Sequence, residues 1–479
     1  MRFDEYAAYD GLGLAELVRK GEVTAAELVE AAIDGIERFN PRLNAVVHKA
    51  YDEARAAANG PLSGPFAGVP FLIKDLGLEV AGWPRTSGSR FAPETADARD
   101  SELVRRYRAA GVVSVGKTNT PEYGIPGVTN SDRLGPCANP WNPDHISGGS
   151  SGGAASATAA GIVPLAHASD GLGSIRIPAA CCGLVGLKVT RDRTPNGPDD
   201  YDRAIGFSVD HVVSRTVRDS AAMLDATDGP EPDSPYAPPP KARRYLEEVA
   251  TPPGRLRIGF SSRTASGRPI APEVQAAFEG VVKLLEELGH ELVPHDIDID
   301  WRRLYRAQGR VSAANFSAGM KRRIELMGRE PGPDELGPLA RRAYEAGKQI
   351  SGQEALWGWQ ELRAFNRKIL ASLAPFNVYL QPVMGTPPPR IDALDPGAME
   401  LDAFDKAQAR AFPFTPPFNF TGQPSMSLPL AWSASGLPLG MMFTGRYADE
   451  VTLFRLAAQL EQARPWAGRR PAMVSAQHA

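Results

Sequence analysis

Cysteine is scarce in this chain, and the residue spacings typical of metal sites are missing from it. Only three cysteines, Cys137, Cys181 and Cys182, occur among 479 residues. An odd number with two adjacent members argues against a disulfide framework, because neighbouring cysteines rarely bridge each other. No cluster of histidine, aspartate and glutamate has zinc-type spacing, so we expect no metal, no other cofactor and no effect of chelators.

Long apolar runs and an excess of positive charge are also lacking. No segment approaches the roughly 18 apolar residues of a membrane-spanning helix, and the N-terminus, Met-Arg-Phe-Asp-Glu-Tyr, lacks the apolar core of a signal peptide. The net charge is −3, which provides neither a basic footprint for nucleic acid nor a polybasic membrane anchor. We therefore expect a cytoplasmic protein that binds neither nucleic acid nor membrane and acts on a small neutral molecule.

A histidine in a catalytic context is missing as well. The seven histidines are His48, His145, His167, His211, His290, His295 and His478. None of them lies in a recognisable triad context, and Ser174 occurs in Gly-Leu-Gly-Ser-Ile rather than in the Gly-x-Ser-x-Gly elbow. A Ser-His-Asp mechanism is therefore poorly supported, and we interpret His145 and His167 as packing or hydrogen-bonding residues.

A glycine- and serine-rich segment, residues 147–188, organises the chain. It begins Ser-Gly-Gly-Ser-Ser-Gly-Gly, continues through an alanine-rich run and ends in Cys-Gly-Leu-Val-Gly-Leu-Lys. A glycine precedes both Ser150 and Ser174, and the two serines flank one apolar helix-and-strand unit. Glycines permit tight turns and the close approach of a substrate. Either serine alone fits a turn at the end of a buried helix, but the two together indicate a catalytic layout.

This segment resembles the signature of the amidase signature family of serine hydrolases, and further landmarks follow in the family's order. They are residues 68–75 (Gly-Val-Pro-Phe-Leu-Ile-Lys-Asp), 116–122 and 139–143 upstream, and 417–424 and 436–440 downstream, the last two resembling C-terminal strands. Together these landmarks cover nearly the whole chain. Within the family, the pattern is most similar to hydrolases of nylon oligomers, the aminohexanoate cyclic-dimer type, and to urethane-cleaving amidases.

The resemblance implies an α/β protein with the amidase signature fold, a central mixed β-sheet covered by α-helices on both faces. It implies one domain over residues 1–479, with a signature core at about 66–215 and a C-terminal α/β part at about 255–470. We interpret the proline-rich stretch at about 229–240 as a connector between them. Local signals agree, since Thr24 and Glu27 form a predicted capping box before an amphipathic helix.

Residue by residue, the resemblance assigns Lys74 as the base, Ser150 as a bridging serine preceded by a cis peptide bond, and Ser174 as the nucleophile. A lysine with an ordinary pKa near 10.4 is a poor base at neutral pH, so burial must lower its pKa. Lys74 follows the apolar run Val-Pro-Phe-Leu-Ile. Taken alone, it is either a strand-end residue reaching water or a buried functional amine, and the two serines favour the second interpretation.

The loop before the nucleophile is expected to stabilise the developing oxyanion. The resemblance assigns this role to the backbone N–H groups of Gly171, Leu172, Gly173 and Ser174. It also implies supporting roles for Asp170 and Arg176, as an ion pair, and for Ser151, by hydrogen bonding. The family usually shows Asp-x-Gly-Gly-Ser, whereas this chain places Leu172 at the first of those glycines. If that position requires positive φ, leucine is strained there.

The expected substrate is a small neutral amide or carbamate with an apolar body, and ester hydrolysis is plausible. We expect Tyr123, Gly124 and Ile125 to face it, because they lie in a long loop rich in asparagine, proline and glycine. A surface loop carried over the sheet is the alternative. The segments expected to line the pocket are residues 123–125, Leu172, 382–384 and 412–418, and none of them supplies an arginine to bind a carboxylate. We expect a monomer or a homodimer.

Two other functions remain open. An amidotransferase subunit of the same family, which releases ammonia for a partner that acts on transfer RNA, typically carries glutamine where this chain has Ile177. A catalytically inactive binding module on the same fold is disfavoured, because Lys74, Ser150 and Ser174 are all present. Labelling by a fluorophosphonate separates an enzyme from such a module.

Overall fold

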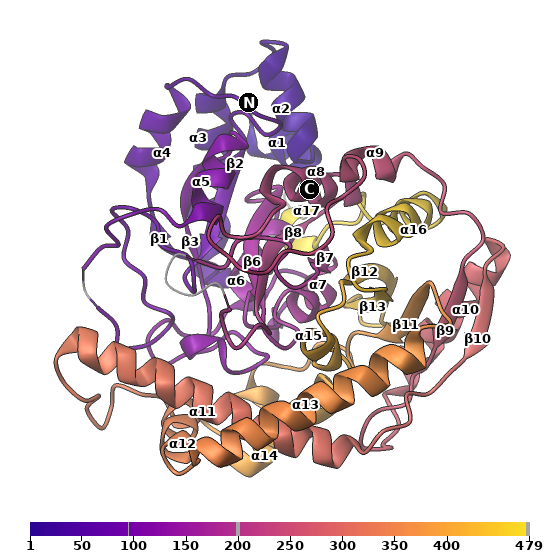
Figure 1. Cartoon of the computed structure of the whole chain (residues 1–479). Helices are drawn as coiled ribbons and strands as arrows, with labels where there is room; N and C mark the ends of the chain where they lie inside the picture. The colour runs from indigo at the N-terminus through magenta and orange to yellow at the C-terminus, as the bar shows by residue number, and fades with distance from the viewer. Residues whose placement is uncertain (94, 198–201, 476–479) are drawn as a thin grey trace.

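The computed structural model of the chain describes residues 1–93, 95–197 and 202–475 (Figure 1). The strands are β1 (Val46–Lys49), β2 (Pro70–Lys74), β3 (Val113–Thr118), β4 (Ala138–Asn139), β5 (Asn142–Ile146), β6 (Leu165–Asp170), β7 (Val185–Lys188), β8 (Val209–Ser214), β9 (Arg257–Phe260), β10 (Glu291–Pro294), β11 (Val378–Pro382), β12 (Ser425–Trp432) and β13 (Pro438–Gly445).

Helices fill the intervals between the strands. They are α1 (Phe3–Ala8), α2 (Gly11–Arg19), α3 (Ala25–Leu43), α4 (Tyr51–Ala58), α5 (Glu102–Ala109), α6 (Gly152–Ala159), α7 (Arg176–Cys182), α8 (Val217–Thr227), α9 (Tyr245–Val249), α10 (Pro272–Glu287), α11 (Trp301–Met327), α12 (Pro338–Lys348), α13 (Gly352–Leu373), α14 (Leu401–Ala411), α15 (Pro417–Thr421), α16 (Glu450–Ala463) and α17 (Ala472–Ser475), with the 3-10 helices η1 (Glu122–Gly124) and η2 (Asp392–Leu394). Among the described residues, no helix is both long enough and apolar enough to cross a membrane.

The largest sheet has eight strands in the order β10-β9-β11-β13-β12-β7-β8-β6. It is mixed, because β9 pairs in parallel with β10 and β11, whereas the remaining neighbours are antiparallel. A second sheet has the order β1-β3-β2, and β4 and β5 form a separate ribbon. The predicted α/β fold with a central mixed sheet is confirmed.

Both faces of the eight-stranded sheet are buried against helices. In β11, the side chains of Val378 and Leu380 join the apolar cluster formed with α8, α10 and α16. Tyr379, between them, joins the cluster on the opposite face, which includes residues of α6, α7 and α13. Successive side chains of a strand point to opposite faces, so an apolar run without alternation fits a strand covered on both sides.

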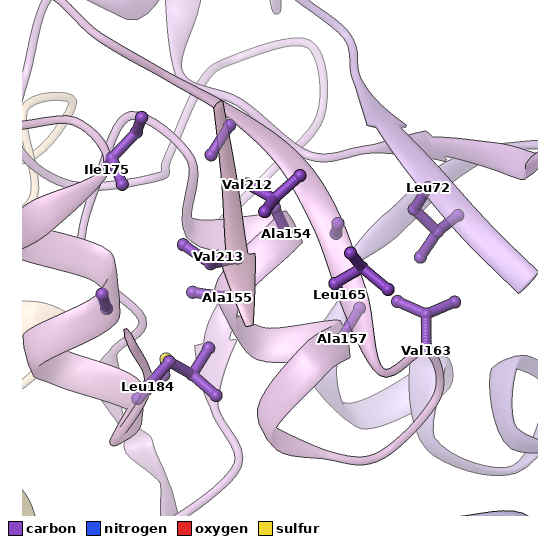
Figure 2. Close-up of a cluster of buried hydrophobic side chains, with 14 of the residues drawn as sticks. Leu72, Ala154, Ala155, Ala157, Val163, Leu165, Ile175, Leu184, Val212 and Val213 are labelled. Atoms are coloured by element: carbon purple, nitrogen blue, oxygen red, sulfur yellow. The ribbon is translucent and has the colours of Figure 1, made fainter. Parts of the chain in front are cut away.

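The alanine-rich run of the signature segment forms α6, which packs closely against β6. Figure 2 shows Ala154 and Ala157 within a buried cluster that also contains Leu165 and Val213. At Gly153 a Cβ atom would lie 2.3 Å from the backbone nitrogen of Asn119. Only residues with small side chains allow the helix to approach so closely, and the approach holds the turn before α6 against the sheets.

The edge strands of the two sheets meet at one seam. β2 is the last strand of the three-stranded sheet and β6 is the last strand of the eight-stranded sheet. The backbone N–H of Lys74, on β2, donates to Nδ1 of His167, on β6, at 3.2 Å. One prediction at the far end of the chain is wrong: residues 417–421 form α15 rather than a strand, because the turn that begins at Pro417 ends in Gly422 with φ 75°. The strand β12 begins only at Ser425.

Candidate active site

Lys74 ends β2 at the seam, with its side chain wholly buried. Its Nζ lies 2.7 Å from Oγ of Ser150, 2.9 Å from Oγ of Ser151 and 3.0 Å from Oγ of Ser169. Lys74 forms no ion pair with any carboxylate in the described part of the chain. Burial lowers the pKa of Lys74 to about 7, since removal from water disfavours the charged amine. The side chain is therefore a buried amine that titrates near neutral pH.

The three hydroxyl groups around this amine come from two elements. Ser150 and Ser151 occupy the turn before α6, where the peptide bond between Gly149 and Ser150 is cis. Ser169 lies on β6. Ser151 donates its own proton to the backbone oxygen of Ser169 at 3.2 Å, so towards Lys74 it acts as an acceptor. A neutral amine has one lone pair, which leaves Ser150 or Ser169 to donate a proton to it.

Ser174 lies in the turn between β6 and α7 and is partly exposed, whereas Ser150 is 2% exposed. Its hydroxyl takes part in no hydrogen bond within the described residues. The structure thus places a solvent-accessible serine on the loop that follows β6, and a buried serine and lysine pair on the strands and turn beside it. Figure 1 shows β6, α6 and α7 adjacent at the centre of the molecule.

The loop before Ser174 is held from within by Asp170. Its carboxylate accepts hydrogen bonds from the backbone N–H groups of Gly173 at 2.6 Å and Ile175 at 3.2 Å. The N–H of Gly173, one of the four proposed oxyanion donors, is therefore engaged by Asp170 in this structure. The N–H groups of Gly171, Leu172 and Ser174 are not used by any hydrogen bond among the described residues, and they remain the candidates for the oxyanion hole.

Leu172 is accommodated without backbone strain. The described residues other than glycine that have positive φ do not include it, whereas Gly173 has a φ of 133°. A Cβ atom on Gly173 would lie 2.3 Å from Oγ1 of Thr415. That same hydroxyl donates to the backbone oxygen of Leu172 at 2.7 Å. The glycine that this loop requires is thus the second of the family pattern, and the first position accepts a side chain.

Asp170 and Arg176 form the expected ion pair, and both are fully buried. Nε of Arg176 lies 2.9 Å from Oδ2 of Asp170. Although burial would raise it, the pKa of Asp170 is held well below its usual range by the charge and hydrogen bonds of Arg176 and by the amide of Asn419. Asn419 donates to Oδ1 of Asp170 at 2.8 Å and to its backbone oxygen at 3.0 Å. The loop before Ser174 is therefore fixed by α15, far along the chain.

The loop expected to face the substrate is only partly placed at the site. A Cβ atom on Gly124 would lie 3.1 Å from Oγ of Ser150, so the backbone of Gly124 borders the buried hydroxyl. Ile125 beside it is 36% exposed. Tyr123 instead donates its hydroxyl to the backbone oxygen of Phe91 at 2.9 Å and packs its ring edge-on against Phe316 of α11. Its side chain therefore supports the loop from α11.

Sequence reasoning missed several groups around the site. Ser169 and Asn419 contact Lys74 and Asp170 directly, and His167 binds the backbone of Lys74. His167 was expected to be a hydrogen-bonding residue, which is confirmed, but its contact with Lys74 was not foreseen. Ser169 was detectable as the polar residue before Asp170 in a buried strand. Asn419 lies in the landmark at 417–424, but no local pattern shows that it contacts Asp170, a residue so far away in sequence.

The three cysteines are free and buried. Burial raises the pKa of Cys137 to about 12 and raises the pKa of Cys181 and Cys182 as well, so none of them is a reactive thiolate. In residues 1–93, 95–197 and 202–475, no group of three or more histidine, cysteine, aspartate or glutamate side chains is arranged to hold a metal ion. The reactive groups of this site are hydroxyls, one amine and backbone amides.

A sequence model of the family described as Amidase matches residues 27–454. The 6-aminohexanoate-cyclic-dimer hydrolase of Paenarthrobacter ureafaciens is 35% identical over 478 residues, which cover 97% of this chain and 97% of that protein. The chain belongs to the amidase family. A solved structure of 6-aminohexanoate cyclic dimer hydrolase superimposes on this amidase with a TM-score of 0.93 and 34% identity, covering 98% of this chain and 99% of that one.

A second solved structure is that of a bacterial aryl acylamidase from the amidase signature family. It matches this amidase with a TM-score of 0.86 and 29% identity, over 96% of this chain and 99% of the other. The resemblance to the family and to the cyclic-dimer hydrolases is confirmed, and the protein is a hydrolase of amide C–N bonds.

Proposed function

We propose that this amidase hydrolyses small neutral amides through Ser174 as nucleophile, Ser150 as proton bridge and Lys74 as base. The observation that carries the proposal is the buried amine of Lys74, 2.7 Å from Oγ of Ser150, with a pKa of about 7. An amine with that pKa is half neutral at physiological pH and accepts a proton without a histidine. A serine needs such a base before it attacks a carbonyl.

In the proposed reaction, Ser150 passes its proton to Nζ of Lys74 and takes the proton of Ser174, whose Oγ bonds to the substrate carbonyl carbon. Negative charge on the carbonyl oxygen is stabilised by the unoccupied N–H groups of Gly171, Leu172 and Ser174. The protonated lysine returns its proton through Ser150 to the leaving amine, and the C–N bond breaks. Water then hydrolyses the acyl-enzyme by the same relay, which restores Ser174.

The proposed substrates are small amides with an apolar body, such as a cyclic aminohexanoate dimer or an anilide. The family members with those names, the cyclic-dimer hydrolase and the aryl acylamidase, align over almost the whole chain. Leu172 and Ile125 add apolar surface to the loops that border Ser174 and Ser150. Carbamates and esters are a second substrate class, because their carbonyl group presents the same target to the nucleophile and to the oxyanion donors.

Fluorophosphonate labelling tests the proposal. The probe is expected to attach to Ser174 in the purified protein, and mass spectrometry of the digested adduct identifies the residue. Ser174→Ala is expected to lose both labelling and amide hydrolysis, whereas Ser156→Ala, in the middle of α6, is expected to keep both. An adduct on another residue, together with an active Ser174→Ala variant, contradicts the assignment.

A substrate comparison tests the charge of the pocket. The values of kcat/KM for an anilide, an aryl carbamate and an amide with a free carboxylate beside the scissile bond are measured on the same preparation. The two neutral substrates are expected to be preferred. A strong preference for the charged substrate shows that the expected pocket is wrong.

A further inference from the structure

A pair of buried residues lies directly behind the lysine of the proposed relay. His167 on β6 accepts the backbone N–H of Lys74 at Nδ1, and its Nε2 lies 2.9 Å from Oδ1 of Asp210 on β8. Both side chains are fully buried. Lys74 belongs to an edge strand, whose outward N–H groups have no ladder partner. The imidazole of His167 accepts the outward N–H of Lys74, the residue of β2 that carries the amine.

The partners of His167 fix its tautomer. Nδ1 receives an N–H and must carry the lone pair, so the proton resides on Nε2 and is donated to Asp210. A second proton would have to bind Nδ1, where it would point at the N–H of Lys74, so the neutral ring is favoured. Burial also lowers the pKa of His167. The imidazole is therefore a neutral connector with one orientation, and its orientation depends on the carboxylate behind it.

Asp210 is held charged by its other neighbour. Arg203, from the segment before β8, forms an ion pair with Oδ2 of Asp210. Although burial would raise it, the pKa of Asp210 is held below its usual value by Arg203 and His167. The charged groups that act on Lys74 are Asp210, Arg203 and Asp170. Tyr107 of α5 covers the ring of His167 and remains neutral, because burial raises its pKa.

We propose that His167 and Asp210 act as a positioning pair for the base, in which His167 fixes the backbone of Lys74 and Asp210 orients His167 and stabilises the lysine when it is protonated. The inference rests on the proposed function, because it assigns these roles relative to Lys74 as base. Neither residue touches the reacting atoms. They act through the position of Nζ and through its charge.

The pair matters because the charge of Lys74 changes during the proposed reaction. Lys74 is neutral before the attack and positively charged while the tetrahedral intermediate exists. A carboxylate behind the lysine favours the charged form, and an arginine beside that carboxylate opposes it, so Asp210 and Arg203 have opposite effects on the protonation of Lys74. Burial lowers the pKa of Lys74, and the balance of these two charges adjusts the pH at which the relay is half active. The hydrogen bond from Lys74 to His167 keeps Nζ among the three hydroxyl groups.

Two substitutions of His167 separate the two contacts. The side-chain oxygen in His167→Asn occupies the place of Nδ1 and accepts the Lys74 N–H, whereas the amide in His167→Gln reaches Asp210 but offers no acceptor to Lys74. The rate of Ser174 labelling by a fluorophosphonate is expected to fall on the order of 10- to 100-fold in His167→Gln, as expected for a displaced reactive group, and less in His167→Asn. Equal rates in both variants and the wild type overturn the inference.

The pH dependence of labelling separates positioning from simple structural support. In Asp210→Asn the acidic limb of the rate profile is expected to move to lower pH, because the charge that favours protonated Lys74 is removed. In Arg203→Gln it is expected to move to higher pH. His211→Gln is the matched control, since His211 is buried on the same strand and contacts Ser220 instead, and its limb is expected to stay in place. Circular dichroism verifies that each variant is folded.

These experiments distinguish a failure of the positioning pair from a failure of the proposed function. If wild-type Ser174 is not labelled, or its labelling does not depend on Lys74, the proposed function fails. If the wild type behaves as proposed but Asp210→Asn and Arg203→Gln leave the limb unmoved, or move it in the same direction, only the positioning pair is overturned. Opposite shifts with an unchanged His211→Gln limb support it.

Discussion

At the scale of single residues, the sequence indicates the candidate reactive groups but not their surroundings. Lys74, Ser150 and Ser174 were identified by motif, and the structure places Lys74 beside Ser150 and a partly exposed Ser174 on the neighbouring loop. Burial of an amine depends on the whole fold, so a strand-end lysine cannot be assigned from its neighbours alone. The N–H of Gly173 is likewise bound by Asp170, a detail that no spacing rule contains.

The protonation of Lys74 predicts an acidic limb in the rate profile. The pKa of Lys74 is about 7, and only the neutral amine accepts a proton, so kcat/KM for a neutral amide is expected to fall about tenfold per pH unit below that value. Measurements of kcat/KM from pH 5 to 9 test this prediction. Lys74→Ala is expected to lose most of the activity, and its remaining activity is expected to lack the fall at acidic pH. A wild-type kcat/KM that does not change between pH 5 and 9 contradicts the prediction.

The same titration predicts a dependence of stability on pH. Folding lowers the pKa of Lys74 from the ordinary range to about 7, so between pH 7 and 10 the unfolded chain binds the proton and the folded chain does not. The free energy of unfolding therefore rises with pH in that window, by about 1.4 kcal/mol per pH unit per group. Lys188 is also buried, with a pKa of about 7, and contributes in the same way.

Lys74→Met is expected to remove one of these two contributions while abolishing activity. Urea unfolding at pH 7 and pH 9.5 measures the difference, and Lys188→Met is the matched variant because Lys188 is likewise a buried lysine with a pKa of about 7. An unchanged pH dependence in Lys74→Met shows that the lysine is charged in the folded protein.

At the scale of elements, regular patterns were predicted well and contextual ones were not. The predicted capping box of Thr24 and Glu27 begins the amphipathic helix α3. Residues 417–424 were predicted as a strand by resemblance, but residues 417–421 form α15. The short α15 is determined by what it contacts, since Asn419 binds Asp170, and short segments lack a periodicity that would reveal this.

The conformation of the loop before Ser174 yields a matched pair of substitutions. Gly173→Ala requires a φ of 133° and brings Cβ to 2.3 Å from Thr415, so it is expected to destabilise the protein by roughly 1–3 kcal/mol and to impair activity. Gly171→Ala introduces a Cβ with no atom within 4 Å and is expected to leave stability within about 0.5 kcal/mol. Thermal unfolding of both variants checks this, and equal losses contradict the loop geometry.

At the scale of the whole molecule, the sequence predicted one domain with a connector at about 229–240. That stretch contains no helix or strand. The strands on either side of it nevertheless share one sheet, because β7 of the signature core pairs with β12 of the C-terminal part. A break at the connector would divide a continuous ladder, so we retain the interpretation of one domain.

This arrangement predicts cooperative unfolding. Urea denaturation followed by tryptophan fluorescence and by far-ultraviolet circular dichroism is expected to show one transition with a common midpoint, and activity is expected to disappear in the same range. Two separated transitions would mean that the signature core and the C-terminal part unfold independently.

The hydrogen bonds from Asn419 to Asp170 have a consequence for when, during its synthesis, the protein becomes active. A growing polypeptide that has reached residue 400 already contains Lys74, Ser150 and Ser174, but it lacks the amide that binds both the carboxylate and the backbone of Asp170. We therefore expect Ser174 to become reactive only in chains that extend past Asn419. Fluorophosphonate labelling of stalled ribosome-bound chains of increasing length tests this, and labelling of Ser174 in chains that end before Asn419 contradicts it.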